Sequence, residues 1–243
     1  MQTFVAILCL ALPILFTGLL AFGVNIRRSS LRLILAFSAA YLFAIAIIHM
    51  LPEAFSNNDA KQAGLFIVIG FCLQLLIDTF STGIEHGHVH LHNNTCHSHL
   101  PYGIIIGLCL HSFLEGLPVY DPGSNSSTHV NYQLILGLGI HNLPITIAFV
   151  ALLREHEHRK IKSFLLLLAF AMMAPLGYLT SYVLQTVGLN NYETYSKMAY
   201  AVVIGIFLHI STAILFESSD QHKYNLRKVA AMLAGIIVAY FMS

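Results

Sequence analysis

The segment LHSFLEGLPV at residues 110–119 places a histidine and a glutamate inside a long apolar stretch. His111 and Glu115 are four positions apart, so on a helix they project from one face, one turn from each other. A charged side chain within a membrane span costs about 2.5–3.5 kcal/mol, and such residues usually serve a function. Imidazole and carboxylate together are ligands that divalent cations such as zinc accept. The pair therefore predicts an ion-binding site.

A second polar group occurs in the segment HNLPITIAF, which contains His141, Asn142 and Pro144. His111 lies about ten residues from the inner end of its predicted helix, and His141 about ten from the outer end of the next. At a rise of about 1.5 Å per residue, both lie near the middle of a hydrocarbon core about 30 Å thick. Pro144 has no N–H, so the carbonyl of Ile140 loses its helical partner. The loosened turn there could supply an oxygen ligand or a hinge.

Four further ionisable residues, within or next to the predicted spans, are candidates for a function. Asp78 could be a gate or a proton carrier, or a structural acid turned inward. His49 and Glu53, also four apart, lie near an outer mouth where they could gather cations, although Glu53 could simply reach the interface. His209, about twelve residues into its helix, falls near the depth of His111 and could be a ligand or bond a backbone carbonyl.

The elements that carry these residues are transmembrane helices. Of the 243 residues 57% are hydrophobic and only 9% charged, whereas a soluble domain carries about 25%. Helices satisfy every backbone group within lipid, and the apolar runs lack the alternation of barrel strands. The sequence predicts an all-α polytopic integral membrane protein with eight transmembrane helices and a metal site between the fourth and fifth. The predicted spans are about 2–24, 30–52, 63–83, 101–120, 131–153, 162–186, 197–217 and 226–242.

Basic residues predict the orientation of these spans. Ten of the twelve lysines and arginines follow odd-numbered spans, and only Lys61 and Lys197 lie on the other side. This asymmetry indicates that both termini are extracytoplasmic. We expect one transmembrane domain over residues 1–243, in the plasma or inner membrane, with the lipid bilayer as its surroundings. A formal net charge of +1 indicates no nucleic-acid partner.

A histidine tract joins the third and fourth predicted spans. The predicted cytosolic loop 84–100 reads IEHGHVHLHNNTCHSHL. Imidazole and thiolate together suit zinc, copper and nickel. Histidines at every second position match neither one face of a helix nor the ligand spacing of a zinc finger. We therefore expect a flexible chelating tether; the alternative is a polar linker. The candidate ligands here include His86, His88, His90 and His92.

Three motifs resemble those of the ZIP family of divalent-metal transporters: HMLPEAF, LHSFLEGLPV and HNLPITIAF. The predicted spans, the outward termini and the histidine-rich loop are also similar to that family. The resemblance implies a carrier that is not an enzyme and has no organic cofactor. It would move Zn²⁺ toward the cytosol, with Fe²⁺, Mn²⁺ or Cd²⁺ as alternatives, by alternating access without ATP hydrolysis. A homodimer is compatible with this reading.

The chain departs from the two-metal centre that this resemblance implies. Carried over, the main site would use His111, Glu115 and His141, but the usual carboxylate four residues after His141 is Ile145. The second site would need ligands where the chain has Ser112, Asn142 and Ala174. We therefore expect one metal site, whose shell is completed by water or by Ser112, Asn142 or His209.

Other functions are compatible with the same residues. An intramembrane zinc-dependent hydrolase could use the same midplane residues to activate a water. The HExxH motif is absent, however, and the nearest candidate for a separate base is Asp78. A metal sensor could use the histidine tract instead. Glu115 itself could be a hydrogen-bonding residue between helices, which is typically worth under about 1 kcal/mol.

Overall fold

The computed structural model describes residues 2–23, 28–56, 59–81, 101–120, 129–157, 159–187, 192–217 and 226–242. Within these ranges the chain is helical, and the only β-type contact is an isolated antiparallel bridge between Tyr120 and Val130. The α-helices are α1 (Gln2–Gly23), α2 (Arg28–Ile45), α3 (Leu51–Ser56), α4 (Ala60–Ser81), α5 (Tyr102–Gly116), α6 (Tyr132–His156), α7 (Lys160–Thr186), α8 (Tyr192–Glu217) and α9 (Leu226–Met242).

The predicted all-α membrane architecture is confirmed. In the described part of the chain, seven helical segments are long and apolar enough to cross a membrane. The eighth predicted span corresponds to α9, which has 17 residues and at about 1.5 Å per residue nearly matches a hydrocarbon core of about 30 Å. The chain is therefore an all-α polytopic membrane protein.

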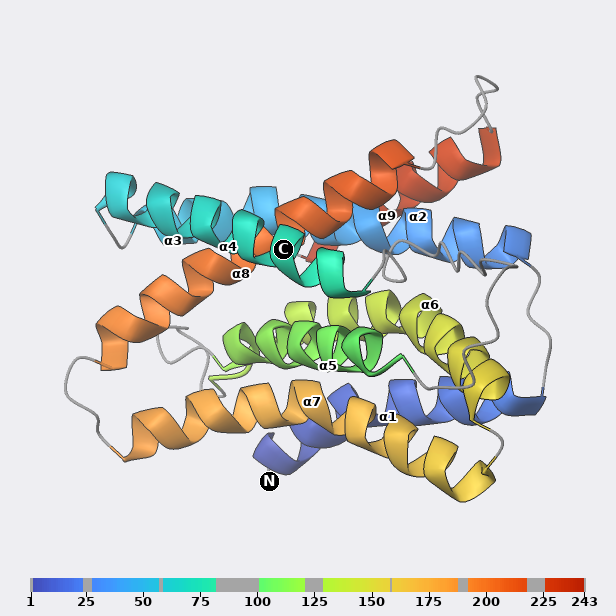
Figure 1. The fold of residues 1–243 in the computed structure, drawn as a ribbon. Coiled ribbons are helices and arrows are strands. Elements are labelled where there is room, and N and C mark those ends of the chain that lie inside the picture. Colours follow the sequence, from blue (N-terminus) through green and yellow to red (C-terminus); the bar gives the residue numbers. More distant parts are fainter. Residues whose placement is uncertain are drawn as a thin grey trace.

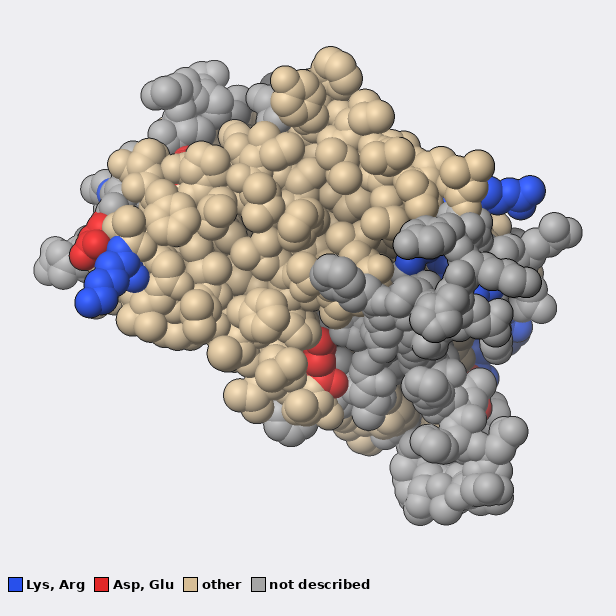
Figure 2. Space-filling model, turned by 90° about the horizontal axis from the view of Figure 1, so that it is seen from above, with Lys and Arg blue, Asp and Glu red and all other residues tan. Residues whose placement is uncertain are grey.

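The surface agrees with a lipid environment. Large apolar side chains are exposed along α1 and α4, for example Phe16, Leu65 and Leu75. On the face seen in Figure 2, lysine and arginine side chains lie toward the two ends of the long dimension, and the broad surface between them is mostly uncharged, apart from an acidic group near its lower edge. Such a band is what the hydrocarbon core requires, because a charge there costs several kcal/mol.

The second span differs from the prediction at its end. It was expected to stop near residue 52, but the helical path continues to Ser56. A π-helical turn, η1 (Ala46–Met50), joins α2 to α3, and the backbone N–H of Leu51 bonds the carbonyl of Ala46. Pro52 has no N–H to offer the carbonyl four residues back. A π turn is one way for a helix to continue past such a residue.

The helices form two groups (Figure 1). In the first helix group, α1 packs on α6 and α7, and α5 packs on α7; in the second helix group, α4 and α2 both pack on α8, and α2 also packs on α9. Contacts of α2 with α6, and of α4 with α5, join the two groups. A core cluster that includes Ile14, Leu108, Phe149 and Phe170 lies wholly within the first group.

Close backbone approach explains the contact of α5 with α7. A Cβ added to Gly116 would collide with the carbonyl oxygen of Ala174, and one added to Gly177 would collide with that of Phe113. Small residues of this kind let transmembrane helices approach closely. Gly116 therefore lets α5 lie close against α7 at the position next to Glu115.

The second helix group has a matching contact between α4 and α8. A Cβ on Gly70 would collide with the backbone of Val202, and a Cβ on Gly205 would collide with the carbonyl of Ile67. The backbones of α4 and α8 are therefore held close together over this crossing.

The ends of α5 and α6 are defined by their local sequence. After Gly116 the chain tightens into a 3₁₀ turn, η3 (Leu117–Val119), which contains Pro118 at its start, so the α-helical part of the predicted span 101–120 ends at Gly116. Asn131 caps α6, because its side-chain oxygen accepts a hydrogen bond from the N–H of Leu134 at 2.9 Å. Helix α6 then continues through Pro144.

Candidate metal centre

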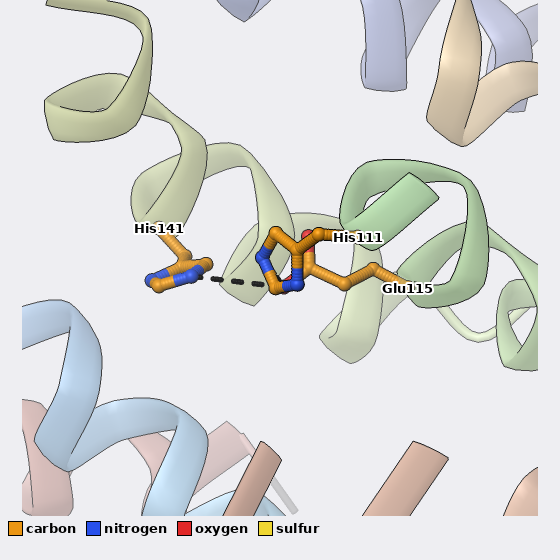
Figure 3. A group of neighbouring side chains, drawn as sticks. All are labelled: His111, Glu115 and His141. Atoms are coloured by element: carbon orange, nitrogen blue, oxygen red, sulfur yellow. Dashed lines mark ion pairs between the residues drawn. The ribbon is translucent and has the colours of Figure 1, made fainter. Parts of the chain in front are cut away.

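Three side chains meet at the seam between α5 and α6. His111 and Glu115 extend from α5, and His141 extends toward them from α6 (Figure 3). All three are fully buried. One carboxylate oxygen, Glu115 Oε1, lies 3.2 Å from His111 Nε2 and 3.6 Å from His141 Nε2. We call these residues the His–Glu–His cluster.

The spacing within the His–Glu–His cluster suits a shared metal ion. A charge-assisted N–H···O⁻ hydrogen bond is about 2.7–2.9 Å long, shorter than either separation here. Two ligands at about 2.0–2.1 Å from a tetrahedral ion are instead about 3.4 Å apart. Each residue can offer one ligand atom, and those atoms all lie within 4.8 Å of one another. Two neutral imidazoles and one carboxylate could therefore bind one divalent cation.

The cluster connects helices that are held by different neighbours. Helix α5 packs mainly on α7 and α4, whereas α6 packs mainly on α1 and α2. In the described part of the chain, α5 and α6 are not among the closely packed helix pairs. Long side chains from the two helices reach across the seam, so a movement of one helix would change the distance between ligands.

Ser112 and Asn142 adjoin the cluster in sequence and are also buried, with 0% and 2% of their surface exposed. Ser112 Oγ and Asn142 Oδ1 meet no hydrogen-bond donor among the described residues. A buried polar oxygen without a donor is costly, by about 1–3 kcal/mol. Both oxygens are therefore candidates to complete an ion's shell directly or through water. The hydroxyl of Thr146 donates to the main-chain carbonyl of Asn142 at 2.6 Å.

Two buried apolar residues occupy positions where the family resemblance implies further metal ligands, Ile145 at the main site and Ala174 at a second one. Ile145 is 1% exposed and Ala174 is 0% exposed, and neither has an atom that can coordinate a metal. Among the described residues, the His–Glu–His cluster is the one group of three or more potential ligands. These observations favour the expected single-ion site.

His209 and Asp78 lie together on the second helix group. His209 Nδ1 is 3.4 Å from Asp78 Oδ2, and His209 does not belong to the group of three ligands. Asp78 Oδ1 accepts a hydrogen bond from Gln74 Nε2 at 2.9 Å. The depth of His209 was expected to bring it near His111, but depth alone does not determine which neighbour a side chain faces.

Near the predicted outer mouth, Glu53 accepts a hydrogen bond from the Tyr200 hydroxyl at 2.8 Å. This contact connects α3 to α8. His49 lies in the π turn one helical turn before Glu53 and is half-buried. The tract residues His86, His88, His90 and His92 lie outside the described residues.

Two residues that make these polar contacts, Gln74 and Tyr200, were not among the candidates predicted from the sequence. Gln74 did carry a signal, because a glutamine four residues before an aspartate in an apolar helix shares its face. Tyr200 carried none, since a tyrosine near a helix end usually indicates an interface anchor.

Comparison with known proteins identifies the family of the chain. A comparison with curated proteins gave no match. The family model described as ZIP zinc transporter matches residues 2–104 and 97–243, which together cover the chain from its second residue to its last. The chain therefore belongs to the ZIP zinc transporter family, a family of divalent-metal transporters.

Proposed function

We propose that this chain carries Zn²⁺ across a membrane toward the cytosol, one ion at a time, through the His–Glu–His cluster. The observation that carries the proposal is the meeting of His111, Glu115 and His141, fully buried in the middle of spanning helices, with ligand separations of 3.2 and 3.6 Å. Three buried ionisable side chains in lipid are costly, and binding a cation offsets that cost.

The ligand set favours zinc over manganese. Imidazole nitrogen suits Zn²⁺, Cu²⁺, Ni²⁺ and Fe²⁺, whereas Mg²⁺, Ca²⁺ and Mn²⁺ prefer oxygen. Two imidazoles and a single carboxylate therefore support Zn²⁺ and its analogue Cd²⁺ over Mn²⁺. One carboxylate neutralises only half the charge of a dication, so the ion is held loosely enough to leave, as a carrier needs.

The arrangement of helices supports transport by alternating access. The ligands belong to α5 and α6 of the first helix group, and the second helix group is tied separately by the close crossing of α4 and α8. Movement of the first group against the second would turn the cluster toward one side of the membrane and then the other. The basic residues support outward termini. A plasma or inner membrane and a homodimer stay predictions.

Flux in proteoliposomes tests the proposal. Wild type should transport Zn²⁺ and Cd²⁺ without ATP, and Glu115→Ala and His141→Ala should each abolish flux because the ion loses a ligand. Matched controls are Glu155→Ala and His156→Ala, at the end of α6 and remote from residue 141 in the helix; both should retain flux.

The measurement has a clear opposite outcome. Equal flux in Glu115→Ala, His141→Ala and wild type, with all proteins inserted, would remove the cluster from the transport path. Flux of Mn²⁺ at a rate above that of Zn²⁺ would leave the path in place and overturn the ion preference.

A further inference from the structure

A second polar group, mostly but not fully buried, lies on the second helix group. Asp78 of α4 and His209 of α8, which we call the Asp–His pair, are separated by 3.4 Å between Oδ2 and Nδ1. Their side chains are 13% and 9% exposed. Gln74, one turn before Asp78 and fully buried, donates to the other carboxylate oxygen at 2.9 Å. The ring of Phe71 meets the His209 ring edge-to-face at 4.8 Å between centroids.

Each contact of the Asp–His pair limits the motion of a potential ligand. The amide of Gln74 holds Asp78 by Oδ1, so Oδ2 is turned toward the imidazole. Phe71 restricts the His209 ring. The glycine crossing of α4 and α8 holds the two backbones close together. The nitrogen and the oxygen are therefore pre-positioned, and they belong to helices packed on each other.

The distance between Asp78 Oδ2 and His209 Nδ1, like the distances within the His–Glu–His cluster, suits two ligands of one metal ion better than a direct hydrogen bond. At 3.4 Å it exceeds the length of a charge-assisted hydrogen bond, about 2.7–2.9 Å. It equals the separation of about 3.4 Å between two ligands of a tetrahedral ion. We propose that Asp78 and His209 form a second, weaker binding site for a divalent cation, with Gln74 positioning the carboxylate. That this cation is the transported one rests on the proposed function.

The position of the pair indicates when an ion would occupy it. Asp78 lies in the last turn of α4, whereas His111 is in the middle of α5, and one segment joins the end of α4 to the start of α5. Helices α4 and α5 also contact each other. The pair is therefore nearer than the cluster to the predicted cytosolic side. With two protein ligands instead of three, it would receive an ion after the cluster and release it more readily.

Ion counting in the full-length chain tests this site. We would measure equilibrium binding of radioactive Cd²⁺ to wild type in nanodiscs and to the double variant Asp78→Asn/His209→Gln. The variant should bind one ion fewer per chain. The matched control Glu155→Gln/His156→Gln, also an acid and a histidine, should bind as many ions as wild type. The histidine-rich segment is present in every protein, so its contribution cancels.

The alternative is that Asp78 and His209 only tie α4 to α8, as polar contacts between transmembrane helices do. In that case the double variant would unfold at a lower temperature but bind as many Cd²⁺ ions as the control, and the proposed site would be wrong. Crystals of wild type soaked in Cd²⁺ give a second measurement that needs no variant. An anomalous peak between Asp78 and His209 supports the site, and a peak at the His–Glu–His cluster alone overturns it.

Failure of this site and failure of the proposed function are distinguishable. If Glu115→Ala keeps wild-type flux, the transport path is wrong, whatever the ion count at Asp78 and His209. If Glu115→Ala loses flux but Asp78→Asn/His209→Gln keeps the full ion count, the path stands and the second site falls. If both hold, the double variant should slow Cd²⁺ flux by about tenfold without abolishing it.

Discussion

The His–Glu–His cluster and the Asp–His pair contain the same kinds of side chain, but their helices differ. The cluster lies across a seam between α5 and α6, which pack mainly on other helices, whereas the pair lies on α4 and α8, which are held together at Gly70 and Gly205. The cluster is fully buried, and the pair is slightly exposed. Ligands across a seam can separate when one helix moves, but ligands on a close crossing stay at a fixed distance.

This difference assigns the two sites different roles. A site whose ligands separate can change its affinity during a transport cycle, as a carrier requires. A site of constant geometry binds with constant affinity and can only pass an ion on. The difference between the two sites depends on individual side chains, so substitutions can test it.

The largest effect is expected from Glu115→Gln. Glutamine keeps the size of the side chain but removes the one negative charge of the cluster. Loss of an outer partner typically lowers metal affinity 10–100-fold, so the loss of a ligand charge should reduce Zn²⁺ flux by at least about 100-fold. Radiotracer uptake into proteoliposomes measures this. Asp78→Asn, measured in the same assay, should lower Zn²⁺ flux by no more than about tenfold. An equal loss of flux in both variants would contradict the difference in role between the cluster and the pair.

Ile145→Glu should strengthen the cluster. Residue 145 is one turn after His141 on the same helix face and is 1% exposed. A carboxylate there would neutralise the remaining charge of a dication, so Cd²⁺ should bind about tenfold more tightly and leave more slowly. Equilibrium binding and flux, taken together, measure this change. Tighter binding with faster flux would contradict the view that loose binding serves release.

Gly116→Ala and Gly70→Ala compare the two close crossings. In each, the added methyl would collide with a backbone carbonyl across the crossing, and overpacking typically costs about 1–3 kcal/mol. Both variants should therefore unfold at a lower temperature. The chain has no tryptophan, so light scattering or size-exclusion chromatography, which need no tryptophan fluorescence, can follow the unfolding. Only Gly116→Ala, next to Glu115, should also weaken Cd²⁺ binding to the cluster. Weaker binding at the cluster in Gly70→Ala would contradict the separation of the two helix groups.

The smallest effect is expected from Tyr200→Phe. The substitution removes the hydroxyl that donates to Glu53 at 2.8 Å and leaves the ring. Polar contacts between transmembrane helices average about 0.6 kcal/mol, so the midpoint of thermal unfolding should fall only slightly. The matched comparison is Tyr195→Phe on the same helix, whose side chain is 63% exposed. A fall several times that of Tyr195→Phe would indicate that Glu53 does more than connect α3 to α8.

Much of the fold could be predicted because hydropathy and length are properties of one segment at a time. The spans and the uneven distribution of basic residues could be predicted without knowing which helices pack together. The common depth of His111 and His141 also followed from counting residues along each helix, and the structure brings these side chains together. The pairs of helices that pack closely could not be predicted by counting residues along one helix. Close packing depends on small residues on two segments at once, as at Gly116 and Gly177.

His209 illustrates the limit of that reasoning. Its position along α8 gives a depth, but the direction of its side chain depends on how α8 is rotated and on which helix lies opposite. That helix is α4, because Gly70 and Gly205 bring the two backbones together, so His209 meets Asp78 instead of His111. The partner of a polar residue in a bundle is decided by such crossings.

The π turn at Ala46–Met50 has a consequence for the outer end of the second span. A π turn holds one residue more than an α turn, and each residue of an α-helix advances by about 100° around the axis. Every side chain from Leu51 onward is therefore offset by about 100° from the phase that α2 alone would impose. Glu53 reaches Tyr200 in this offset phase, so conversion of the turn to regular α-helix would rotate its carboxylate away from α8. The π turn thus determines the angular position of the outer acid.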